Sequence, residues 1–153
     1  MKLSKRELLI LGAGIYACEG AKFRVDNNGK KHYDVDFTNN DPKLISLFLR
    51  FIRECIHAPE ERIKAQLFIY PDHNEAEVIN FWSNITKIPQ SRFTKVMHMV
   101  QRSGRFKPSK YGTLKVRYFH KENFLAIQGI ITKVLNMEES PSGYGIRLES
   151  VRE

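Results

Sequence analysis

The chain has 153 residues, a formal net charge of +8 and 42% hydrophobic residues. This length predicts one domain with a hydrophobic core that needs no disulfides or structural metals. No apolar run is long enough to span a membrane and the first residues lack a signal-peptide cleavage pattern, so we expect a cytoplasmic protein without a membrane partner. A Walker-type glycine loop and Cys/His zinc spacing are both absent from the sequence, which excludes these two common kinds of site.

The positive charge is concentrated in one part of the chain. Residues 87–121 hold ten Lys or Arg and no Asp or Glu, whereas the remaining residues hold 15 basic and 17 acidic side chains. Solvated surfaces usually mix both signs, so an acid-free stretch of this length indicates a polyanionic partner. The stretch has the pattern of strands and loops rather than of an amphipathic helix, which favours nucleic acid over an acidic membrane surface.

Periodicity and turn residues predict an α+β fold in the order αββαβαββα. The predicted elements are a helix over 4–19, strands over 22–25 and 32–38, a helix after 41, a strand over 63–70, a helix after 74, strands over 93–100 and 113–119, and a helix over 122–135. Residues 1–136 would form one domain. The polar tail over 137–153 is expected to be partly disordered or to form a small accessory hairpin.

Several local sequence signals predict where the helices begin. Ser4 with Glu7 matches a capping box, Asn40 or Asp41 precedes Pro42 at the start of the second helix, and Asn74 with Glu77 starts the third. The expected buried residues of these helices are Leu44, Leu47, Phe48, Phe51, Cys55 and Trp82. Cys18 and Cys55 are interpreted as reduced core thiols.

The strand over 32–38 alternates in polarity. Tyr33, Val35 and Phe37 would face a core, whereas His32, Asp34, Asp36 and Thr38 would face polar contacts.

The first predicted helix ends in small residues followed by a single acid, in the run Gly12-Ala13-Gly14-Ile15-Tyr16-Ala17-Cys18-Glu19-Gly20. Small residues allow another backbone to approach closely. Glu19 would lie at the helix end where the macrodipole disfavours negative charge, and a bound cation would offset that cost. The alternative is a core helix with a glycine C-cap and a surface Glu19.

This run resembles the signature motif of the LAGLIDADG homing endonucleases. The matching positions are the small pair Ala13 and Gly14, the apolar Ile15 and Tyr16, the small Cys18, the metal-binding acid Glu19 and the terminal Gly20. Two residues depart from the motif, because Gly12 replaces the usual leucine and Ala17 replaces the first acid. The order of elements agrees with the family over about residues 5–86.

The resemblance implies a saddle-shaped antiparallel sheet with helices on one face. It also implies a Mg²⁺ or Mn²⁺ ion held by Glu19 and the backbone carbonyl of Gly20. With one copy of the motif, two chains must pair to bring two Glu19 side chains together, through Gly12, Ala13, Gly14, Tyr16 and Ala17. The family's polar and basic catalytic residues would correspond to Asn39 and to one of Lys87, Lys95 and Lys115, although Asn39 also fits a turn or helix cap.

We expect the polar strand faces to contact base edges in the major groove of DNA. The candidates are Lys22, Arg24, Lys30, Lys31 and His32 around the first hairpin, and Lys115 and Arg117 on the strand over 113–119. Arg102, Arg105, Lys107 and Lys110 are expected to contact phosphates, which position a protein rather than specify its site.

These patterns favour a homodimeric, metal-dependent DNA endonuclease that makes a double-strand cut at a near-palindromic site. The alternative is a non-cleaving protein of the same fold, either a transcription regulator on DNA or a splicing maturase on intron RNA. A metabolic enzyme is disfavoured because no nucleophile–base pair or cofactor loop stands out.

Overall fold

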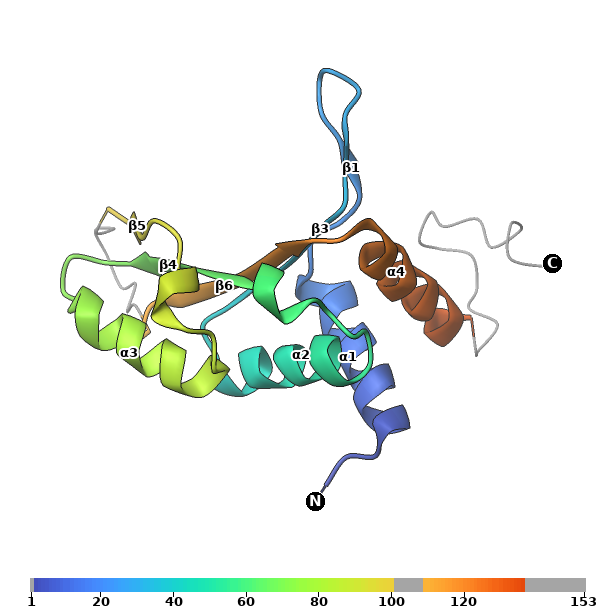
Figure 1. Cartoon of the computed structure of the whole chain (residues 1–153), viewed down its shortest axis with the longest axis horizontal. Coiled ribbons are helices and arrows are strands. Elements are labelled where there is room, and N and C mark those ends of the chain that lie inside the picture. Colours follow the sequence, from blue (N-terminus) through green and yellow to red (C-terminus); the bar gives the residue numbers. More distant parts are fainter. Residues whose placement is uncertain (1, 101–108, 137–153) are drawn as a thin grey trace.

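The computed structural model describes residues 2–100 and 109–136, and it confirms the α+β class (Figure 1). The helices are α1 (Lys5–Glu19), α2 (Pro42–Glu54), α3 (Glu75–Thr86) and α4 (Lys121–Leu135), with short 3-10 turns η1 (Glu60–Arg62) and η2 (Gln90–Arg92). The strands are β1 (Arg24–Val25), β2 (Lys31–His32), β3 (Asp34–Asn39), β4 (Lys64–Ile69), β5 (Met97–His98) and β6 (Thr113–Phe119). In this described part, no helix has the length and apolar character needed to cross a membrane.

The main sheet has the strand order β3-β6-β4-β5. Strand β6 is antiparallel to both β3 and β4, whereas β4 and β5 pair in parallel. The sheet is therefore mixed, not the purely antiparallel sheet that the family resemblance implies. The residues after α1 extend it on the outer side of β3, because Gly20 bridges Phe37 and the Ala21 amide donates to the Asp36 carbonyl at 2.9 Å.

The helix starts follow the predicted local signals. The Ser4 hydroxyl accepts from the Glu7 amide while the Glu7 carboxylate accepts from the Ser4 amide, which confirms the capping box. Of the two candidates at the second helix, Asp41 is the cap and accepts from the Lys43 amide at 2.8 Å. Asn74 likewise caps α3. Each cap satisfies an amide that the first helical turn leaves without a partner.

The core lies between one face of the sheet and the helices beneath it. Alternate residues of β3, β4 and β6 are buried on this face, as the period of a strand requires. They are Val35 and Phe37, Ala65, Leu67 and Ile69, and Leu114, Val116 and Tyr118. Helices α2 and α3 lie along this face (Figure 1), and Trp82 on α3 is fully buried, as expected.

Helix α2 buries Phe48 and Phe51 as predicted, but the rest of its buried set differs from the one expected. Its buried residues are Ile45, Phe48, Leu49, Phe51 and Ile52, whereas Leu44, Leu47 and Cys55 are only partly buried. The reason is that α2 contacts α1, α3 and β3 at once, which buries a broader stripe than a single contact would.

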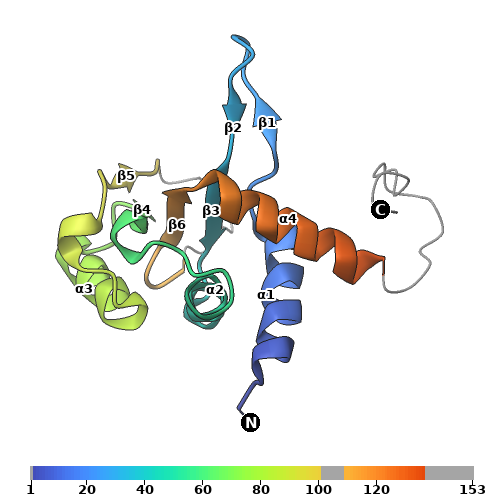
Figure 2. The same cartoon turned by 45° about the vertical axis from the view of Figure 1, so that its right-hand side comes forward.

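The predicted strand over 32–38 is divided in two at Tyr33. Strand β2 pairs with β1 in a separate hairpin that projects away from the main sheet, whereas β3 belongs to that sheet (Figure 2). Tyr33 lies between Phe23 and Phe124, with ring centroids at 5.6 and 5.9 Å. This aromatic contact lies at the point where the chain passes from the hairpin to the sheet.

The predicted strand over 93–100 is also shorter in the structure, because only Met97 and His98 form a strand with β4. The phosphate-contact candidates Arg102, Arg105 and Lys107 and the tail over 137–153 lie outside the described residues.

Candidate nucleic-acid interface

The face of the main sheet opposite the core carries mostly polar side chains, and we call it the polar face. Its residues are Asp34, Asp36 and Thr38 on β3, Thr113, Lys115 and Arg117 on β6, and Lys64, Gln66 and Phe68 on β4. The predicted alternation of the strand over 32–38 is confirmed for β3. None of these nine side chains is fully buried.

The strand register sets two rows of the polar face across all three strands. One row runs Asp36–Arg117–Lys64 and the next runs Thr38–Lys115–Gln66, because the three strands pair at these positions. Adjacent strands lie about 4.8 Å apart, so each row spans roughly 10 Å. A surface of this width, with ammonium, guanidinium and amide donors, has the chemistry to contact phosphates and base edges.

Arg117 is held in place by two carboxylates of β3. Its guanidinium lies 3.6 Å from Asp34 and 3.5 Å from Asp36. Burial raises the pKa of Asp36, while Arg117 and Lys115 oppose that rise. The Oδ1 atom of Asp36 is buried and has no hydrogen-bond partner among the described residues, so its ion pair with Arg117 carries most of its stabilisation.

The remaining cations of this surface have more freedom. Lys64, Lys95 and Lys115 form no ion pair with any of the described residues, and the Lys115 ammonium lies 5.7 Å from the centroid of the Phe68 ring. An unpaired surface cation is available to a polyanion without first losing a protein partner. These lysines, rather than Arg117, are therefore the stronger phosphate-binding candidates.

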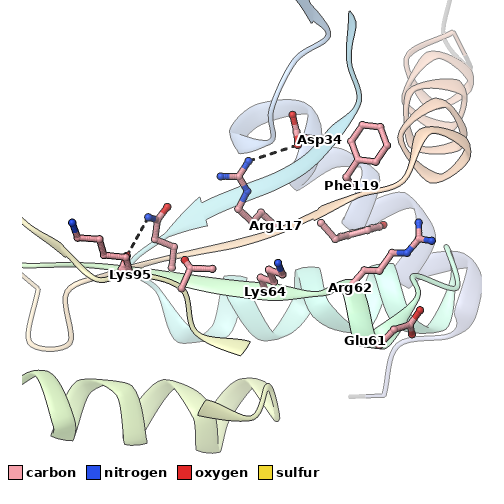
Figure 3. Close-up of a pocket in the computed structure, with 10 residues that line it drawn as sticks. Asp34, Glu61, Arg62, Lys64, Lys95, Arg117 and Phe119 are labelled. Atoms are coloured by element: carbon pink, nitrogen blue, oxygen red, sulfur yellow. Dashed lines mark hydrogen bonds and ion pairs between the residues drawn. The ribbon is translucent and has the colours of Figure 1, made fainter. Parts of the chain in front are cut away.

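Two hollows open on the polar face. One of about 410 Å³ lies at the base of the hairpin, and several predicted DNA-binding residues line it: Lys22, Arg24, His32, Lys115 and Arg117. The other, of about 690 Å³, lies between β6, β4 and η1 (Figure 3). Lys95, a predicted catalytic residue, lies on the rim of this second hollow.

Arg24 and His32 of the hairpin segment both contact Asp34 of the polar face. His32 lies 3.1 Å from Asp26 in the hairpin turn and 3.6 Å from Asp34 on β3, and Arg24 lies 3.9 Å from the same Asp34. Arg24 and His32 therefore make contacts within the chain, in addition to any contact with a ligand. Lys30 and Lys31 are exposed on the hairpin, beyond the polar face.

Helix α1 ends at the edge of the main sheet with Glu19 exposed. The Lys22 ammonium donates to the Ala17 carbonyl, so a lysine of the chain itself meets the negative end of the helix dipole. The Lys22 ammonium therefore offsets part of the unfavourable negative charge at this helix end, a role that the sequence assigned to a bound cation. Among residues 2–100 and 109–136, no three His, Cys, Asp or Glu side chains gather closely enough to hold a metal ion.

The other predicted catalytic residues lie at different distances from this edge. Asn39 ends β3 and its side chain accepts from the Asp41 amide at 2.9 Å, which is the turn role considered above. Lys115 is on β6, directly beside β3, whereas Lys95 lies beyond β4 on the other side of β6. Lys87 ends α3 in a left-handed conformation. Of the three lysines proposed for catalysis, Lys115 is therefore the one on the strand that neighbours β3, the strand beside the end of α1.

The residues expected at a dimer interface are divided between two sides of α1. Ala13 and Tyr16 are fully buried in the chain's own core, and a Cβ at Gly12 would overlap the Phe51 ring. These three residues therefore face α2 and the sheet and cannot meet a second chain. Gly14 instead has nothing within 4 Å of an added Cβ.

The solvent side of α1 carries small and apolar residues, which we call the outer stripe. They are the exposed Ile10, Leu11 and Cys18, together with Gly14 and Ala17, which are partly buried. Ile10 is 38% exposed and Leu11 42% exposed, and Cys18 is exposed rather than the core thiol that was expected. The outer stripe keeps Gly14 and Ala17 from the predicted set and adds residues that the motif alone did not single out.

Sequence reasoning also missed Lys64 and Gln66 on the polar face, and Phe119 at the end of β6 beside it. The first two alternate with Ala65 and Leu67 inside a predicted strand, so the alternation could have identified them. Lys110, a predicted phosphate contact, is exposed with its ammonium 5.1 Å from the centroid of the Tyr111 ring.

No protein-family model, curated protein or solved structure matches this chain. The candidate site therefore rests on the residues and geometry of the chain itself.

Proposed function

We propose that the chain is a homodimeric, Mg²⁺- or Mn²⁺-dependent DNA endonuclease of LAGLIDADG type, which cuts a near-palindromic site. The observation that carries the proposal is the polar face, bearing unpaired lysines, beside a small-residue helix that ends in Glu19 at the edge of the same sheet. Cations for binding and an acid for cleavage would then act on the same nucleic acid.

Binding would begin with the hairpin and the polar face. A major groove about 12 Å wide admits a two-stranded ribbon, and the β1–β2 hairpin projects beyond the sheet (Figure 2). Lys30 and Lys31 would contact phosphates beside the groove. Gln66 and Lys115, adjacent in one row of the polar face, would donate to base edges or to the phosphate near the cut.

A second copy would complete the cleavage site. The outer stripe of α1 offers apolar side chains around Gly14, where another helix backbone can approach closely. Pairing of two outer stripes about a two-fold axis would bring both Glu19 side chains to one place. It would also extend the polar face over two half-sites, as the two-fold symmetry of a palindrome requires.

The donor set suits a hard cation. The Glu19 carboxylate and the Gly20 carbonyl are oxygen ligands, which Mg²⁺ prefers, but one chain supplies only one carboxylate. Two chains would supply two, and their mutual repulsion would be relieved by bound metal. Such a metal polarises a phosphate and lowers the pKa of an attacking water. Lys115 would bind a phosphate oxygen, and Glu19 would hold the metal ion at the phosphate that is cut.

Cleavage of a randomised plasmid library in Mg²⁺, followed by sequencing of the ends, tests this function. Glu19→Gln should abolish cutting by removing the charge at constant size, while DNA affinity measured in Ca²⁺ should stay within about twofold because phosphate binding lies elsewhere. Glu122→Gln is the matched control, since this carboxylate is exposed in the first turn of α4. Equal cutting by wild type and Glu19→Gln would contradict the active-site assignment.

One observation favours the second candidate, a DNA- or RNA-binding protein that does not cut. Lys22 already meets the end of α1, so the helix is stabilised without a metal ion. A wild type that binds DNA in Ca²⁺ yet cuts no library sequence in Mg²⁺ or Mn²⁺ would establish this function instead. Preference for an intron RNA over duplex DNA would then separate a maturase from a transcription regulator.

A further inference from the structure

The hollow of about 690 Å³ combines charge with an exposed aromatic ring (Figure 3). Four cations and two acids line it, together with polar and aromatic side chains. The charged residues are Arg62, Lys64, Lys95, Arg117, Asp34 and Glu61. The lining is therefore net positive, and its volume falls within the ~300–1,000 Å³ of small-molecule sites.

The positive charge of this hollow is not cancelled by internal pairing. Arg117 is paired with Asp34 at 3.6 Å, but Arg62, Lys64 and Lys95 form no ion pair within the described parts of the chain. Arg62 comes from η1, Lys64 from the start of β4, and Lys95 from the segment before β5. Three unpaired cations from separate segments around one hollow raise the local concentration of anions.

Phe119 contributes the aromatic ring. It follows Lys115 and Arg117 on the same face of β6, and 57% of it is exposed to solvent. Its neighbour Tyr118 points the other way, is buried, and meets the Asn123 amide at 3.3 Å. Phe119 therefore adds little to the core, and its ring borders a hollow lined by cations.

We propose that this hollow binds an unpaired nucleotide, with the base against the Phe119 ring and the phosphate against Arg62 and Lys64, while Lys95 adds positive charge at the far end of the hollow (Figure 3). A base within a duplex is stacked on both sides and cannot offer its face to Phe119, whereas an unpaired base can. The site lies within one chain and uses neither Glu19 nor a second copy. It stands apart from the cleavage proposed above.

The same chemistry is present in a free mononucleotide and in an unpaired nucleotide of a longer strand. Three probes distinguish them: AMP, a single-stranded oligonucleotide with one 2-aminopurine among adenines, and a blunt duplex of the same sequence. Stacking on Phe119 should quench 2-aminopurine fluorescence in the single strand, and the duplex should bind without this signal. Competition by AMP would identify a free nucleotide as a ligand, and failure of AMP to compete would assign the site to nucleotides within a strand.

Two substitutions test the residues. Phe119→Leu keeps an apolar side chain but removes the stacking surface, and it should weaken single-strand binding by about tenfold or more, the scale of one lost base stack. Duplex affinity should change less than about twofold. Phe23→Leu is the matched control, because Phe23 is an exposed phenylalanine on the hairpin and does not line this hollow.

Lys64→Gln should weaken single-strand binding and lower its salt dependence, since one phosphate contact is lost. Lys43→Gln, at an exposed position of α2 away from the hollow, should leave both unchanged. Circular dichroism confirms that each variant is folded. The proposal is overturned if Phe119→Leu binds the single strand as wild type does, or if it loses single-strand and duplex affinity equally.

Discussion

Two glycines of α1 have opposite surroundings although they lie two positions apart. An added Cβ at Gly12 would overlap the Phe51 ring of α2, whereas one at Gly14 would meet nothing within 4 Å. Gly12 thus allows α1 and α2 to approach closely. Gly14 serves no contact inside the chain, and in a helix interior a glycine costs about 1 kcal/mol relative to alanine.

Alanine substitutions should therefore change stability in opposite directions. Gly12→Ala forces the Phe51 ring to move and should lower the free energy of unfolding by about 1–3 kcal/mol. Gly14→Ala should raise it by about 0.5–1 kcal/mol, because only the glycine penalty is removed. Urea unfolding at low protein concentration measures both. Equal changes in the free energy of unfolding would mean that Gly12 does not face Phe51 and Gly14 does not face open space.

Residue patterns predicted the strand faces better than the helix faces. The two-residue period of a strand leaves only two choices, so Val35 and Phe37 are on the core side of β3 as expected. Helix α1 is apolar or small nearly all round, so its sequence does not specify which side meets the core. The motif does not distinguish Tyr16 from Gly14, yet Tyr16 is fully buried whereas Gly14 is partly exposed with open space beside it.

At the scale of elements, one arginine joins three segments. The Arg53 guanidinium on α2 makes two 2.8 Å hydrogen bonds to the Glu60 carboxylate of η1 and a third to the Thr86 carbonyl at the end of α3. Arg92 lies 3.3 Å from the same carboxylate. Arg53 and, more weakly, Arg92 lower the pKa of Glu60.

The lowered pKa predicts how Glu60 affects stability with pH. Because the carboxylate is ionised more easily in the folded than in the unfolded chain, its contribution is present above the ordinary value of 4.5 and is lost as pH falls through the folded pKa. About half of the side chain faces solvent, so Glu60→Gln should cost no more than about 1 kcal/mol at pH 7 and close to nothing at pH 2.

Urea unfolding of wild type and variant at both pH values provides the measurement. Glu54→Gln is the control, since Glu54 pairs with Arg50 at 2.9 Å on the same helix and joins no other element. Its cost should be smaller than that of Glu60→Gln, because both side chains of this pair are exposed to water. A Glu60→Gln cost that is the same at both pH values would exclude the ion pair as its origin.

Element boundaries were predictable where one local signal dominated. Strand β6 has the predicted bounds, 113–119, because polar and apolar residues alternate from Thr113 to Tyr118. The predicted strand over 93–100 was too long, because β5 pairs with β4 at only two positions. The length of an edge strand is set by its neighbour, which a single sequence does not contain. The division at Tyr33 depends likewise on Phe124, about ninety residues away in the chain.

At the scale of the whole molecule, the candidate interface depends on strand order. Strand β6 lies between β3 and β4. Arg117 therefore contacts Asp34 and Asp36 of β3 on one side, and on the other side it lies opposite Lys64 in the backbone register of β4. The sequence predicted that Lys115 and Arg117 share a face. It did not predict these cross-strand rows, because the hydrophobic pattern defines which face is buried but not which strands are neighbours.

The chain should self-associate through the outer stripe of α1. Wild type should be a dimer at micromolar concentration, because a single copy of the motif gives one Glu19 and the proposed metal site needs two. Gly14→Leu should yield monomers in sedimentation velocity, since the new side chain separates two helices that must approach closely. It should not unfold the chain, because no atom lies within 4 Å of the added Cβ.

Gly129→Leu is the matched control. Gly129 is an exposed glycine on α4 with nothing within 4 Å of an added Cβ, so the same change there adds equal apolar surface away from the outer stripe. This variant should remain dimeric. The exposed Cys18 provides a second readout, because pairing of two outer stripes about a two-fold axis should bring two copies of Cys18 together, so that oxidation cross-links wild type but not Cys18→Ser. A monomeric wild type, with and without DNA, would remove the second chain from the proposed site and leave the unpaired-nucleotide pocket as the function to pursue.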